Sequence, residues 1–159
     1  MKTKTVLITL LALCFLVGGA GCNRDNPYEE IKIKDFSYQG CKEIVIHYTK
    51  ASEREEYIEY KAVADGYLDI KHVNAVFNCC PGTIEATVTM QGNEITIVET
   101  ETDPQCKCIC DYDLEYSVGP LSSNTEYTLI FCRDNDEYLR FTIKYKSSLK
   151  GKVTVQKFK

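Results

Sequence analysis

The sequence predicts an all-β protein, an antiparallel β-sandwich cross-linked by disulfide bonds. Beyond residue 30 the chain is a series of short runs in which apolar and polar residues alternate, separated by turn residues, as in half-buried strands. Eleven tyrosines, six phenylalanines and many valines, isoleucines and threonines supply residues that favour strands. Seven cysteines in the same part of the chain indicate disulfides, which form outside the reducing cytoplasm.

The first 21 residues have the three parts of a secretory signal peptide. Lys2 and Lys4 precede an apolar run over residues 6–17, and four small residues follow at 18–21. The run of about 12 apolar residues is too short for a transmembrane helix, which needs roughly 20. The segment therefore predicts export from the cell interior.

The end of this segment resembles the lipobox of bacterial lipoproteins, because the small residues Ala20 and Gly21 stand directly before Cys22. The resemblance implies that the chain is cut after residue 21 and that lipid is attached to Cys22. Each buried methylene of the lipid contributes about 0.8 kcal/mol, so several acyl chains would hold the protein firmly on a membrane, which we expect to be the outer membrane. Gly19 departs from the pattern, which usually has Leu there, so ordinary signal cleavage is the alternative.

Residues 22–30 are polar and contain Pro27, which predicts a tether, and residues 31–159 are enough for a single domain with its own core. Removal of the first 21 residues takes away two lysines and no acidic residue. The remaining 17 basic and 23 acidic side chains give a net charge of −6. This charge argues against nucleic-acid binding, which needs a basic surface.

Ten strands are expected in the domain. They lie at residues 31–36, 43–48, 57–63, 67–77, 83–90, 94–100, 108–118, 126–132, 138–145 and 152–158. The clearest hairpin joins the fifth and sixth strands, where Gly92 and Asn93 tolerate the positive φ of a tight turn. A second hairpin turns at residues 133–136. Residues 53–60 could form a helical turn, but the alternation over residues 57–63 favours a strand.

Residues 114–131 resemble the crossing between strands E and F of a fibronectin type III or related immunoglobulin-like sandwich. The resemblance implies that Leu121 in the connecting loop fills the core and that Tyr127 turns its hydroxyl back to the loop backbone, the arrangement called a tyrosine corner. The fold expected from it is an immunoglobulin-like antiparallel sandwich, although this chain has no Trp for the core. In its signal segment and cysteine-rich strands the whole chain also resembles the small lipoproteins of the Bacteroidetes type, most of which have no assigned function.

With Cys22 reserved for lipid, seven cysteines are candidates for disulfides, and the odd number leaves at least one without a partner in the chain. The candidates are Cys41, Cys79, Cys80, Cys106, Cys108, Cys110 and Cys132. Residues two apart on an extended strand lie about 6.8 Å from each other, too far for the cysteines at 106, 108 and 110 to pair among themselves.

We therefore expect at least one bridge from Cys79 or Cys80 to the group at residues 106–110, and a second bridge from Cys41 to Cys132. The alternative for the same residues is a thiolate metal site. Structural zinc holds all its sulfurs about 2.3 Å from the ion. A strand at a spacing of two carries its sulfurs too far apart for that, so disulfides are favoured and no cofactor is expected.

The sequence contains no Gly-x-Ser-x-Gly elbow, no His-Glu-x-x-His helix and no glycine-rich phosphate loop. Its two histidines, His47 and His72, fall within expected strands and are interpreted as residues at a sheet face. A nucleophile needs a base within reach and a group that orients the base. The chain is therefore not expected to be an enzyme.

Carboxylates gather in two places. They are Glu53, Glu55, Glu56 and Glu59 in one group and Asp111, Asp113 and Glu115 in the other. The second group shares the strand face opposite the cysteines, which predicts a solvated strand surface. Calcium binding is the alternative, although no EF-hand pattern follows.

Together these observations predict a membrane-anchored, extracytoplasmic lipoprotein that acts as a non-catalytic binding or structural module. The candidate surface for a glycan or protein ligand is on the tyrosine-rich strands, at Tyr57, Tyr60 and Tyr67, and the favoured alternative is that each of these tyrosines is half-buried packing within a sheet. The alternative is a protein inhibitor of an extracytoplasmic hydrolase, in which a disulfide-braced loop lowers the entropic cost of binding. A thiolate metal-binding protein is the second alternative.

Overall fold

The structure is a computed structural model that describes residues 30–42, 44–45 and 54–156. All ten expected strands are present, and the described residues contain no α-helix. They are β1 (Lys32–Gln39), β2 (Ile44–Val45), β3 (Tyr57–Ala62), β4 (Leu68–Asn78), β5 (Thr83–Gln91), β6 (Glu94–Thr102), β7 (Ile109–Gly119), β8 (Glu126–Arg133), β9 (Asp136–Lys144) and β10 (Lys150–Thr154), with one 3-10 turn, η1 (Ala64–Gly66). The strand favoured over the helical turn near residue 57 is confirmed as β3.

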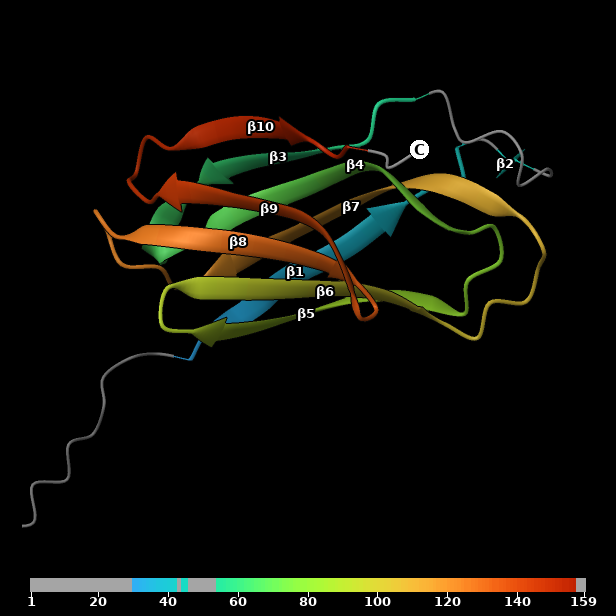
Figure 1. The fold of residues 1–159 in the computed structure, drawn as a ribbon, viewed down its shortest axis with the longest axis horizontal. Coiled ribbons are helices and arrows are strands. Elements are labelled where there is room, and N and C mark those ends of the chain that lie inside the picture. The colour runs from blue at the N-terminus through green and yellow to red at the C-terminus, as the bar shows by residue number, and fades with distance from the viewer. Residues whose placement is uncertain (1–29, 43, 46–53, 157–159) are drawn as a thin grey trace, which may run out of the picture.

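The strands form two sheets that lie one over the other (Figure 1). The larger sheet has the order β1-β7-β4-β3-β10, and β2 also pairs with β7, beyond the residues that β1 occupies. The smaller sheet has the order β5-β6-β8-β9. The expected all-β sandwich is thus confirmed, and it encloses one core between the two sheets.

One strand pair differs from the expected antiparallel arrangement, because β6 and β8 run parallel. The connection between them explains the direction. The chain leaves the smaller sheet after β6, returns along the larger sheet as β7, and re-enters the smaller sheet as β8 at the end where β6 began. The smaller sheet is therefore mixed, and the larger sheet is antiparallel.

Alternating side chains of both sheets fill the core. Ile58, Leu68 and Leu114 of the larger sheet and Ile97 and Leu129 of the smaller sheet are fully buried. This burial is the main stabilising contribution, at roughly 25 cal/mol for each Å² of apolar surface removed from water. Every second residue faces outward, as the alternation in the sequence predicts.

The two expected hairpins are confirmed. β5 and β6 are joined at Gly92, whose φ of 60° is in the left-handed region that glycine adopts without strain. β8 and β9 turn at Asp134, with φ of 54°. Asp and Asn tolerate this conformation better than other residues with a side chain.

The crossing from β7 to β8 has the geometry expected of a tyrosine corner. Tyr127 is buried, and its hydroxyl accepts a hydrogen bond from the backbone N–H of Ser122 at 2.9 Å. Leu121 in the loop is buried in the core. The described part of the chain includes no helix of the length and apolar character needed to cross a membrane.

Candidate functional site

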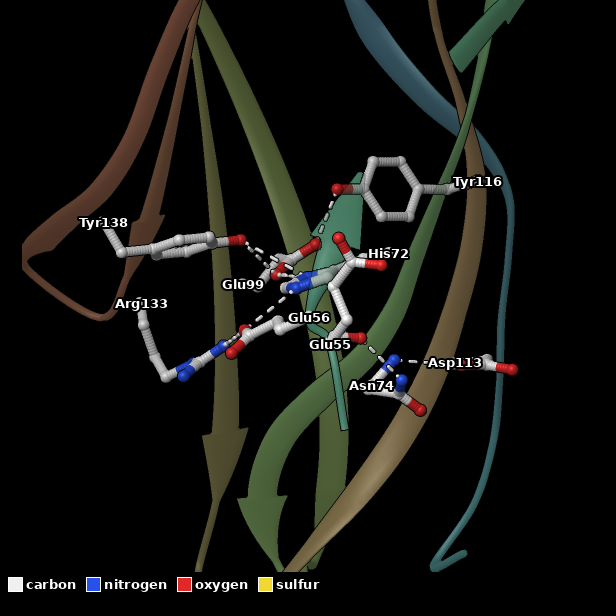
Figure 2. A network of polar contacts seen from close by, with 9 residues as sticks. All are labelled: Glu55, Glu56, His72, Asn74, Glu99, Asp113, Tyr116, Arg133 and Tyr138. Atoms are coloured by element: carbon white, nitrogen blue, oxygen red, sulfur yellow. Dashed lines mark hydrogen bonds and ion pairs between the residues drawn. The ribbon is translucent and has the colours of Figure 1, made fainter. Parts of the chain in front are cut away.

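A group of charged and polar side chains lies inside the sandwich, between the two sheets (Figure 2). We call it the inter-sheet cluster. Three members come from the side of the larger sheet and three from the smaller sheet. They are Glu56, just before β3, His72 on β4 and Tyr116 on β7, and Glu99 on β6, Arg133 on β8 and Tyr138 on β9.

His72 is the centre of the cluster. Its Nδ1 lies 2.7 Å from Oε2 of Glu99, and its Nε2 lies 3.1 Å from Oε1 of Glu56. Carboxylate oxygens only accept hydrogen bonds, so both ring nitrogens donate and the imidazole carries a proton on each. His72 is therefore a cation held between two carboxylates that come from opposite sides of the core.

The other members add hydrogen bonds to the same two carboxylates. Tyr116 donates to Oε1 of Glu99 at 2.7 Å, and Tyr138 donates to Oε2 at 2.8 Å. Arg133 donates from Nη2 to Glu56 at 3.1 Å, and its guanidinium lies over the ring of Tyr138. A buried charge is costly unless it is paired and hydrogen-bonded, and here two cations face two anions.

The geometry shifts the protonation of His72 and the two carboxyls. Burial alone lowers the pKa of His72, but Glu99 and Glu56 outweigh it and raise that pKa to about 9. Burial also raises the pKa of Glu99, which the His72 charge and the hydrogen bonds reverse, so its pKa lies below the ordinary value. The pKa of Glu56 is lowered in the same way, by His72 and Arg133 acting against burial.

The tyrosines respond in the opposite direction. Burial and the neighbouring charge of Glu99 raise the pKa of Tyr116 and Tyr138 well above the ordinary value, so both keep their protons. His72 and Glu99 are fully buried. Neither can reach a substrate unless the sheets separate, and the arrangement joins the sheets instead of presenting a base or an acid to solvent.

His72 is on a strand at a sheet face, as expected, and the structure shows that this is the face that meets the core. The alternation contained the signal, because His72 continues the inward row of Leu68 and Ile70. Glu99 continues the inward row of Ile95 and Ile97 in the same way. His47 lies outside the described residues.

The outer face of the larger sheet carries a hollow of about 880 Å³, which we call the outer hollow. Outward side chains of β1, β3, β4, β7 and β10 line it, and acids and lysines are interleaved. The charged members are Asp35, Glu59, Asp69, Glu115, Lys61, Lys71, Lys150 and Lys152. Lys71 pairs with Glu115 at 2.6 Å and Lys61 with Asp69 at 3.5 Å.

The three tyrosines expected to form a ligand surface do not share one face. Tyr57 points outward beside the outer hollow, and its ring is covered by the ammonium of Lys152 at 3.5 Å. Tyr60 contributes to the floor of the outer hollow, while its ring stacks on Phe141 across the core. Tyr67 is buried, with Lys34 over its ring.

The expected solvated face at residues 111–115 is wrong at its first member. Asp111 is buried at a point where the segment after β1 lies alongside β7, and the N–H of Lys42 donates to the Asp111 carbonyl there at 3.0 Å. Asp113 accepts from Lys42 and from the N–H of Asn74. Glu115 is exposed. In the first acidic group, Glu53 lies outside the described residues, and Glu56 is buried in the inter-sheet cluster.

Three disulfides gather at the end of the sandwich where β7 begins. The expected link from the adjacent pair at residues 79–80 is confirmed twice, as Cys79–Cys108 and Cys80–Cys106. The expected Cys41–Cys132 bridge is wrong, since Cys41 pairs with Cys110 and Cys132 is free. Cys41 follows β1, which pairs with β7, whereas Cys132 is on β8 of the other sheet. The pairing of β1 with β7 therefore brings Cys41 to Cys110 and not to Cys132.

No family model matches the chain, and no curated protein and no solved structure matches it either.

Proposed function

We propose that this chain is a lipid-anchored, extracytoplasmic binding module without a catalytic role, and that its ligand lies in the outer hollow. The observation that carries the proposal is the size and lining of that hollow. At about 880 Å³ it falls in the range of roughly 300–1,000 Å³ that small-molecule sites occupy. In contrast, the His–Glu pair that could do acid–base chemistry is sealed in the core.

The interleaved charges indicate the class of ligand. A polymer of one sign would meet repulsion from half of the charged groups in the outer hollow. Hydroxyl groups both donate and accept, so a neutral oligosaccharide can use carboxylates and ammonium groups side by side. Glu59 and Lys150 form no side-chain ion pair with another described residue, which leaves them available to such a ligand.

Binding to a panel of immobilised neutral oligosaccharides tests the proposal. The wild-type chain should bind at least one, and Glu59→Ala or Lys150→Ala should weaken binding about tenfold, the loss of roughly 1.4 kcal/mol. The matched controls are Glu126→Ala and Lys144→Ala, exposed residues of the same types on the smaller sheet. Equal losses in the controls, or no binding to any glycan, would contradict the proposal.

A separate measurement tests the proposal that the chain is not an enzyme. The captured oligosaccharide, kept with excess protein and then weighed by mass spectrometry, should be unchanged. A shortened or modified product would show that the module is an enzyme.

A second candidate, an inhibitor of an extracytoplasmic hydrolase, is favoured by one observation. The connection from β6 to β7 is exposed at residues 103–105, and Cys106 and Cys108 brace it through two disulfides. Bracing of this kind lowers the entropy lost on binding. Inhibition of a panel of secreted proteases and glycosidases by the intact chain, relieved by Gln105→Ala, would support it.

A further inference from the structure

We propose that Cys79, Cys80, Cys106 and Cys108, once their two bridges are reduced, form a site for one thiophilic divalent cation of the zinc type. We call these four residues the sulfur cluster. The inference is independent of the outer hollow, which lies on a different face.

The sulfur positions match such a site. The Sγ atoms of Cys79, Cys106 and Cys108 all lie within 4.8 Å of one another, and Sγ of Cys80 lies 3.9 Å from Sγ of Cys79. In a tetrahedral zinc site with Zn–S bonds of about 2.3 Å, neighbouring sulfurs are about 3.8 Å apart. Opening the two bridges lets the bonded sulfurs move out to this same separation.

On an extended strand Cys106 and Cys108 would be too far apart to share one ion. In the structure β7 begins at Ile109, so both cysteines precede the strand. The chain bends there, and it brings the two sulfurs within 4.8 Å instead of about 6.8 Å. A spacing of two is therefore compatible with one ion at this place.

Backbone hydrogen bonds hold the two cysteine segments together independently of the disulfides. The N–H of Cys79 donates to the carbonyl of Cys108 at 3.1 Å, and the N–H of Gln105 donates to the carbonyl of Cys80 at 3.1 Å. The side chain of Asn78 makes two further hydrogen bonds. It donates to the carbonyl of Cys106 at 2.7 Å and accepts from the N–H of Cys80 at 2.9 Å. These contacts preorganise the four thiols after the bridges open.

The third bridge is the more protected one. Cys110 is buried at 1% exposure and only its partner Cys41 is partly exposed, whereas all four members of the sulfur cluster are partly exposed. Thiol–disulfide exchange requires access to a sulfur. A mild reductant should therefore open the sulfur cluster first and leave Cys41–Cys110 to hold β7.

The chemistry balances with a dithiol as the reductant. Each bridge takes two electrons and two protons from one dithiol, which closes to its own cyclic disulfide. The four thiols then release four protons as they bind one divalent cation as thiolates. The oxidised chain has no thiolate in the sulfur cluster and should not bind the ion there.

Cadmium ion is the probe, because its thiolate complexes give a charge-transfer band in the ultraviolet. The full chain is reduced with a dithiol, the reductant is removed without oxygen, and Cd²⁺ is titrated while far-ultraviolet circular dichroism records the fold. One equivalent should bind with the band, and the oxidised chain should show none. Cys79→Ser/Cys106→Ser should lose the band, whereas the matched pair Cys41→Ser/Cys110→Ser and the single variant Cys132→Ser should keep it.

Three results would overturn the proposal. They are a folded, reduced chain that gives no band, a band equally lost in a Cys41→Ser/Cys110→Ser control that stays folded, and a wild-type chain that unfolds on reduction and stays unfolded with Cd²⁺. The last result counts because the inference requires the backbone contacts to keep the four sulfurs together.

Discussion

His72 of the larger sheet and Glu99 of the smaller sheet form a fully buried ion pair across the core, with 2.7 Å between Nδ1 and Oε2. The pair is a direct polar link between β4 and β6, which are also joined where the N–H of Asn78 donates to the Glu101 carboxylate at 2.7 Å. Apolar contacts alone would allow the two sheets several nearly equivalent alignments, whereas a buried charge accepts only the one in which it is paired. We infer that the inter-sheet cluster sets how the sheets align. Its cost is offset by the ion pairs and hydrogen bonds among its members, although Nε of Arg133 is buried with no hydrogen-bond partner among the described residues.

The first prediction concerns this pair. Glu99→Gln should lower the free energy of unfolding by about 3–5 kcal/mol, because the variant leaves the buried His72 cation with one carboxylate in place of two. Urea denaturation measures the loss, and Glu126→Gln, an exposed change of the same chemistry, should stay within about 0.5 kcal/mol of the wild type. A similar stability for both variants would mean that the pair contributes little.

The second prediction is a pH dependence of stability. His72 binds its proton more tightly in the folded chain, with a pKa of about 9 against 6.5 when unfolded. Its contribution is therefore fully present below pH 6.5 and is lost as the pH rises through about 9. A shift of this size corresponds to roughly 3 kcal/mol.

Urea denaturation at pH values of about 6.5, 8 and 9.5, which span the interval of roughly 6.5 to 9 between the two pKa values of His72, checks this prediction. The wild type should lose unfolding free energy over that range more steeply than His72→Gln. Both proteins carry Cys132→Ser, which prevents thiol exchange at high pH. Parallel curves for the two proteins would show that another group titrates.

The third prediction is the disulfide map. Peptide mapping without reduction should find Cys41 joined to Cys110 and a free thiol at Cys132. Trypsin alone leaves Cys108, Cys110 and Cys132 on one peptide, so a glutamyl endopeptidase must cut after Glu115 and Glu126. A Cys41–Cys132 peptide would contradict the structure.

The same bridge closes the longest loop, with a sequence separation of 69 residues. On the chain-entropy argument, Cys41→Ala/Cys110→Ala should cost about 4 kcal/mol in unfolding free energy. The single change Cys132→Ala is the control, and it should cost much less because no bridge is lost.

The fourth prediction tests the anchor. Cells fed an alkyne analogue of palmitate should label the wild-type chain, and Cys22→Ser should abolish the label and release the protein from the membrane fraction. Cys132→Ser is the control and should be labelled normally. Labelled Cys22→Ser protein would refute lipidation at that residue.

Local alternation was enough to predict the strands, because each strand shows its buried face as a row of apolar residues two apart. The β5–β6 hairpin and the tyrosine corner were predictable for a similar reason, since both depend on residues close in sequence. The same rows predict that the side chain of His72 faces the core. They do not predict which group pairs with its charge. That partner, Glu99, is 27 residues away and on the other sheet.

By itself, the sequence determined the fold class, the strand positions and the link between residues 79–80 and the cysteines before β7, since these follow from periodicity and short loops. Only the tertiary structure decided the partner of Cys41, the parallel pairing of β6 with β8, the inter-sheet cluster and the outer hollow. Each of these depends on which strands become neighbours across or within the sheets. Alternation says which way a side chain faces, and it carries no information about what lies opposite.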